Sequence, residues 1–151
     1  MHKTIISDTS CLIVLSKIGE MDLLKKVYGS IFTTQDIASE FGDSLPEWIE
    51  VLEVKDPFRQ QLLELQIDKG ESSAIALALE IPGSTVILDD FKARKIAIKL
   101  GIQVTGTLGV IIRARQKGII SSIKPILGKL KQTNFRLSTD LESEALMMAG
   151  E

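Results

Sequence analysis

The chain has 151 residues with a formal net charge of −2, and its single His and single Cys exclude a structural zinc site and a His-based catalytic triad. Its length and its hydrophobic content of 44% predict one globular domain over residues 1–151. The apolar segments are too short to span a membrane, no apolar signal core follows the N-terminus, and one Cys cannot form an internal disulfide, so we expect a cytoplasmic protein without membrane contact.

The first element is a short apolar strand within the segment TIISDTS, residues 4–10. An apolar run without alternation is typical of a strand that is buried on both faces of a parallel sheet. The carboxyl ends of such strands open into the crevice where ligands bind, and Asp8 lies at this point. An N-cap for the helix expected next is the alternative role of Asp8.

Apolar periodicity then predicts helices at 10–18 and 21–28, a strand at 30–33, a helix at 34–41 and an edge strand at 48–54. Glu40 lies near the edge of the core-facing side of the third helix. Taken alone, it is interpreted as an ordinary exposed glutamate.

The following elements are helices at 57–67, 71–81 and 91–101 and strands at 85–88 and 103–105. Glu71 lies in a first helical turn, where a carboxylate complements the helix dipole, but its small apolar neighbours place it close to the core. Asp89 and Asp90 follow a strand directly. One residue suffices for a cap, and two adjacent like charges are unfavourable without a cation.

Helices expected at 110–118, 121–130 and 141–150 complete an alternation of strands and helices that is typical of βαβ units. In such a fold the strand ends before Asp8 and Asp89 lie at one edge of the sheet, and the helices that carry Glu40 and Glu71 can reach it. Carboxylates that converge there repel one another unless divalent cations neutralise them. Oxygen ligands favour Mg²⁺ or Mn²⁺, which can activate water for phosphodiester hydrolysis.

The charge is distributed unevenly along the chain. Residues 1–90 hold 7 Lys/Arg and 16 Asp/Glu, residues 91–136 hold 11 Lys/Arg and no acid, and residues 137–151 hold 4 acids and no Lys/Arg. The basic segment begins directly after Asp90, so it is expected to place phosphate contacts beside the acidic centre. The residues expected to contact the phosphates of a polyanion are Lys92, Arg94, Lys95, Arg113 and Arg115. Solvated helix faces that point away from one another are the alternative.

Other acid-rich α/β sites fit the sequence less well. Haloacid-dehalogenase-type phosphatases need Asp-x-Asp at the first strand, whereas Thr9 and Ser10 follow Asp8. Receiver domains have adjacent acids on the first strand, whereas here the pair comes after residue 85. No dinucleotide-binding or P-loop glycine spacing occurs.

The pattern resembles the PIN domain, the fold of metal-dependent ribonucleases that includes the VapC-type toxins of toxin–antitoxin pairs. The resemblance covers nearly the whole chain and depends on ISDTS, the helix with Glu40, GESSAIALA, and ILDDFKARKIAIKLGIQVTGTLG. The Asp-Asp-x-x-Ala-Arg and Gly-Thr-Leu-Gly elements resemble a largely uncharacterised prokaryotic branch. The resemblance implies an α/β, three-layer fold with a central parallel sheet of about five strands, in the order 3-2-1-4-5, flanked by helices.

The resemblance also implies a set of site residues. Metal ligation and catalysis would fall to Asp8, Glu40, Glu71 and Asp90, with Asp89 as the alternative ligand at the strand end and Ser10 in a supporting role. Asp90 is preferred because Ala93 and Arg94 follow it as they do in the family. The third acid is often Asp in the toxins, and here it is the longer Glu71.

The sequence therefore leads to the hypothesis of a Mg²⁺- or Mn²⁺-dependent endoribonuclease, the toxin of a toxin–antitoxin pair. RNA, a cognate antitoxin and a second copy of the chain (a homodimer) are the partners that it suggests. The alternative is a non-catalytic PIN module that binds nucleic acid or protein.

Overall fold

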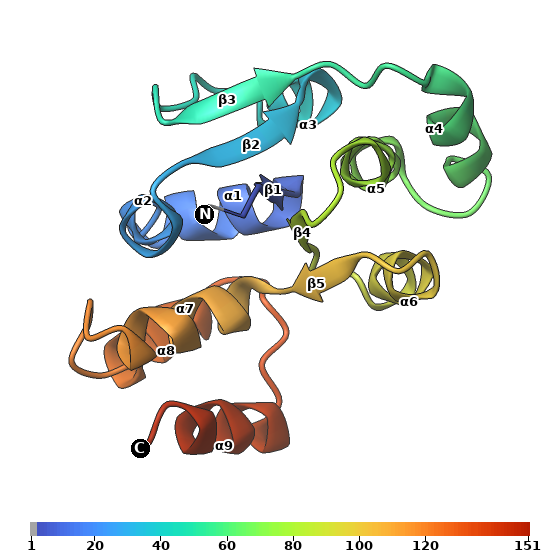
Figure 1. The fold of residues 1–151 in the computed structure, drawn as a ribbon. Coiled ribbons are helices and arrows are strands. Elements are labelled where there is room, and N and C mark those ends of the chain that lie inside the picture. The colour runs from blue at the N-terminus through green and yellow to red at the C-terminus, as the bar shows by residue number, and fades with distance from the viewer. Residues whose placement is uncertain (1–2) are drawn as a thin grey trace.

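A computed structural model describes residues 3–151 and contains a five-stranded sheet, all parallel, in the order β3-β2-β1-β4-β5 (Figure 1). The strands are β1 (Ile5–Ser7), β2 (Ile31–Thr34), β3 (Ile49–Leu52), β4 (Thr85–Ile87) and β5 (Gln103–Thr105). The expected α/β class and strand order are thus confirmed. β1 is buried at every position and lies in the middle of the sheet, as its unbroken apolar run predicts.

Nine helices are present in the described part of the chain and lie on both sides of the sheet. They are α1 (Thr9–Lys17), α2 (Asp22–Tyr28), α3 (Gln35–Phe41), α4 (Pro57–Leu63), α5 (Lys69–Glu80), α6 (Phe91–Lys99), α7 (Thr107–Gln116), α8 (Lys124–Leu130) and α9 (Thr139–Met148). Figure 1 shows α5 and α6 together on one side of the strands, whereas α2 and α7 pack against each other on the other side.

The register of the central strands aligns their carboxyl ends. Ser7 of β1 pairs with Ile87 of β4, and Ile87 pairs with Thr105 of β5. The segments that follow these residues therefore leave the sheet side by side, and each leads to the start of a helix. This arrangement places Asp8 beside the turn that carries Asp89.

Helix α5 is the most deeply buried helix of the sheet's flank. Its residues 72–78 are all buried, which the small side chains of SSAIALA permit. Ser73 forms a 2.6 Å hydrogen bond with Thr34, the residue that caps α3, and thereby joins two helix starts inside the core. Cys11 is fully buried in the core, as a small hydrophobic residue would be.

Several element boundaries differ from the sequence-based predictions. Helix α4 ends at Leu63 rather than 67 because turns follow it, and α8 begins at Lys124 rather than 121 because residues 121–123 are irregular. Helix α7 begins at Thr107, three residues before the predicted start. Ser138, not the predicted Thr139, caps α9 by accepting the Leu141 N–H. None of the helices within residues 3–151 has the length and apolar character needed to cross a membrane.

Candidate metal and nucleic-acid site

Asp8 is the most deeply buried acid of the site and caps α1. Its Oδ1 accepts the N–H of Cys11 at 2.9 Å, and its Oδ2 accepts the N–H of Asp89 at 3.2 Å. Burial raises the pKa of Asp8 well above its usual value, the charges of Asp89 and Glu71 raise it further, and the two N–H donors lower it. Asp8 therefore has both roles that the sequence left open: it caps a helix and it lies among other carboxylates.

Asp89 is held in place by Thr107, the first residue of α7, which follows the neighbouring strand β5. Its Oδ1 accepts the N–H of Thr107 at 2.8 Å, and its Oδ2 accepts the Thr107 hydroxyl. Gly106 makes this approach possible, since a Cβ there would lie 3.0 Å from Oδ1 of Asp89 and 2.9 Å from Nη1 of Arg94. Asp89 thus caps α7 from across the sheet edge, which explains why α7 begins at Thr107.

Asp90 and Glu71 lie at the first turns of two neighbouring helices. Asp90 caps α6 by accepting the Ala93 N–H at 2.9 Å, and Asp68 caps α5 by accepting the Glu71 N–H at 2.8 Å. Burial, followed by the charges of Asp68 and Asp90, raises the pKa of Glu71 from 4.5 to about 7. Glu71 is therefore a carboxyl group that titrates close to neutral pH.

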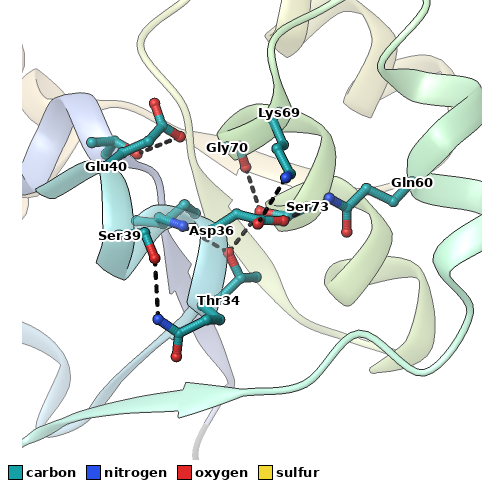
Figure 2. A network of polar contacts seen from close by, with 11 residues as sticks. Thr34, Asp36, Ser39, Glu40, Gln60, Lys69, Gly70 and Ser73 are labelled. Atoms are coloured by element: carbon teal, nitrogen blue, oxygen red, sulfur yellow. Dashed lines mark hydrogen bonds and ion pairs between the residues drawn. The ribbon is translucent and has the colours of Figure 1, made fainter.

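Glu40 approaches the start of α5 from α3, as Figure 2 shows. Its Oε1 accepts the Thr9 hydroxyl at 3.3 Å, and a Cβ on Gly70 would overlap the same oxygen. Burial and the charge of Asp68 raise the pKa of Glu40. Asp36, one turn earlier on α3, points toward Gln60 on α4 and Lys69 at the start of α5, which both contact its carboxylate (Figure 2).

A groove of about 1020 Å³ runs along this edge, and the word groove refers to this cavity below. Three of the predicted acids line it, namely Glu71, Asp89 and Asp90, together with Ser10. Asp8 lies buried next to Asp89, outside the lining, and Glu40 lies on the Thr9 and Gly70 side of the α5 start. The structure thus brings Asp8, Glu71, Asp89 and Asp90 within electrostatic reach of one another and places Glu40 at their border.

The five predicted RNA-binding residues divide into two groups. Arg94 lines the groove and donates to the Leu88 carbonyl at 2.8 Å, and Lys92 and Lys95 are exposed on the same helix. On α7, Arg115 pairs with Glu151 at 3.8 Å, and neither it nor Arg113 lines the groove.

The position of Arg113 is shown by the hydroxyl of Tyr28 on α2. Burial raises the pKa of this hydroxyl, and the nearby charge of Arg113 lowers it. Helix α7 packs against α2, so the exposed Arg113 lies near Tyr28 and outside the groove lining. Residues 91–136 therefore do not present their charges on one face.

The acids have the chemistry that a divalent metal requires. All four donate hard oxygen atoms, and each carboxylate oxygen that accepts one N–H keeps a second lone pair for another partner. No Lys or Arg within residues 3–151 forms an ion pair with Asp8, Glu71, Asp89 or Asp90. In this structure, however, no three acids, His or Cys of that segment are arranged closely enough to hold one ion. The chemistry of the donor set therefore suits a metal, although no three of its donors meet at one point, and each of the four acids lies at or is bound by the start of a helix.

Sequence reasoning missed four residues that belong to the site. Asp68 lines the groove and raises the pKa of Glu71, and Thr107 holds Asp89. The Asp68-x-x-Glu71 spacing, a helix N-cap followed by Glu three residues later, was the signal for the first. Lys17 and Arg136 add two positive charges to the groove lining, and nothing in their local sequence distinguishes them from surface residues.

The comparisons with known proteins point to one family. A family model described as a PIN domain matches residues 4–151. No curated protein and no solved structure matches the chain.

Proposed function

The chain belongs to the PIN domain family, whose members are generally nucleases that use divalent metals, and from this premise we propose that it is a Mg²⁺- or Mn²⁺-dependent endoribonuclease. The observation that carries the proposal is that Glu71, Asp89 and Asp90 line one groove, next to the buried Asp8, and that no ion pair within residues 3–151 neutralises them. Acids at the carboxyl edge of a parallel sheet occupy the place where this class of fold binds its ligands.

The acids, Arg94 and Ser10 have different roles in this proposal. Asp90 and Glu71 line the groove, and Asp8 together with Asp89 or Asp90 would complete a metal-binding set that Glu40 borders. Bound divalent ions would neutralise these charges and supply the activation of water that phosphodiester hydrolysis needs. Arg94 lies in the same groove and would bind a phosphate of the RNA. Ser10, which also lines the groove, would orient water or a carboxylate.

A cleavage assay on single-stranded RNA tests the proposal. We expect cleavage with Mg²⁺ or Mn²⁺, no cleavage in excess EDTA, and loss of cleavage in Asp90→Asn. Asparagine caps helices as well as aspartate does, so this variant removes the charge and keeps the cap. Cleavage that persists in EDTA, or that Asp90→Asn leaves unchanged, would contradict the proposal.

A non-catalytic module that binds nucleic acid or protein is the second candidate, and a specific observation favours it. Asp8, Asp89 and Asp90 each have a structural role as the cap of a helix, so the fold has reason to keep them without catalysis. RNA binding by the parent protein, together with no cleavage under any metal condition, would select this candidate.

The role as a toxin, the cognate antitoxin, the homodimer and the cytoplasmic location belong to the same proposal. They are supported by the family membership alone. Co-expression with the product of a small adjacent gene, followed by isolation of a complex in which cleavage is suppressed, would test the antitoxin.

A further inference from the structure

Phe91 is a large apolar side chain that the fold leaves exposed at the edge of the groove. It is the first residue of α6, directly after Asp90, it lines the groove, and its side chain is 76% exposed. Burying a phenylalanine normally stabilises a fold by about 2 kcal/mol, so this ring contributes little to folding. Because the ring lies beside the acids of the groove, a role in binding a ligand of the groove would explain its exposure.

Positive side chains accompany this ring on α6. The Nζ atom of Lys95 lies 5.8 Å from the ring centroid, within cation–π distance. Lys92 and Arg94 lie on the same helix, and α6 contains no acid between Phe91 and Lys99. An aromatic face among cations, opening on a groove, is the combination with which proteins bind single-stranded nucleic acid: bases stack on the ring and phosphates contact the cations.

We propose that Phe91 is a stacking platform for one unpaired base of single-stranded RNA in the groove; this proposal rests on the ribonuclease function proposed above. A base on this ring would bring its neighbouring phosphate toward Arg94, the cation of α6 that lines the same groove. The bases of a duplex are already stacked on each other and are not free to contact the ring. Phe91 therefore gives the groove a preference for single strands without a preference for sequence.

The test is the affinity for a fluorescent single-stranded RNA oligonucleotide in EDTA, where cleavage is suppressed. We expect Phe91→Ala and Phe91→Leu to bind about 5-fold or more weakly, and Phe91→Trp to bind at least as tightly as the parent. Phe58→Ala is the matched control, since Phe58 is 65% exposed on α4 and does not line the groove. Its affinity should equal that of the parent.

A ribose-phosphate oligonucleotide of the same length without bases separates stacking from charge. It should bind to the parent and to Phe91→Ala equally, because only the phosphate contacts remain. If Phe91→Ala bound the normal RNA as tightly as the parent does, the proposal would be overturned, even if metal-dependent cleavage is observed. The exposed ring would then be a contact for a protein partner. A weaker Phe91→Ala in a protein that cleaves nothing would instead uphold the platform and contradict the ribonuclease.

Discussion

The carboxyl group of Glu71 makes the metal-free fold less stable as the pH rises, and Glu71→Gln should remove this effect. Burial and the charges of Asp68 and Asp90 raise its pKa from 4.5 to about 7. Between these two values the folded chain binds more protons than the unfolded chain, so stability falls as the pH rises. Below pH 4.5 the group is neutral in both states, and above pH 7 the loss is complete.

The size of the effect follows from the shift. A change from 4.5 to about 7 corresponds to about 3 kcal/mol when fully expressed. Because Glu71 is only half-buried, solvent screening reduces the effect to about 1 kcal/mol. Glutamine has the shape of the protonated acid, so Glu71→Gln should match the parent at pH 4 and exceed its stability by this amount at pH 8. For a chain of this length the gain appears as an increase of about 2–4 °C in the melting temperature.

The assay is thermal unfolding of the parent and the variant in EDTA at several pH values. Glu64→Gln, which alters an exposed glutamate beyond the end of α4, controls for the removal of one negative charge and should show no pH-dependent difference from the parent. If the difference in stability between Glu71→Gln and the parent were the same at pH 4 and pH 8, the reasoning would be refuted, because the fold would then not raise the pKa of Glu71.

Two further predictions concern the walls of the groove. Thr107→Val keeps the shape of the side chain and removes the hydroxyl that donates to the carboxylate of Asp89. Denaturant titration should therefore show a loss of about 2 kcal/mol in the free energy of unfolding. An unchanged free energy would contradict the role of Asp89 as a cap of α7. Arg94→Ala should reduce the slope of the log–log salt dependence of RNA binding by about 0.7. Arg113→Ala should leave this slope unchanged, because Arg113 does not line the groove. The reverse result would show that RNA binds at α7 and not in the groove.

Apolar pattern predicted the strands of the sheet, whereas their order was implied by the resemblance to the PIN domain. The unbroken run before Asp8 identifies a central strand, and the segment Gln103–Thr105 was predicted with the boundaries that the structure shows. The start of α7 was missed because Asp89, eighteen residues away, supplies its cap across the sheet edge. No local pattern carries such a contact.

In the site, too, some positions could be predicted from the sequence and others depend on packing. Asp8, Asp89 and Asp90 were predictable because strand ends of a parallel sheet meet at one edge, and their positions follow from register. The position of Glu40 depends on how α3 packs against α5, which Thr34 and Ser73 determine within the core. The direction of Arg113 depends on the packing of α7 against α2. A count of charges along the chain predicts that a segment is basic, but packing decides which of its charges face the groove.

In the proposed function, the acids at the carboxyl edge of the sheet bind a divalent metal and are more than a set of helix caps. Titration of the metal-free protein with Mn²⁺, followed by the melting temperature, tests it most directly, since a ligand that binds only the folded state raises its stability. We predict that Mn²⁺ raises the melting temperature of the parent by several degrees, and that Asp90→Asn, which keeps its cap, loses most of this increase. No increase in the parent, or an equal increase in the variant, would contradict the claim.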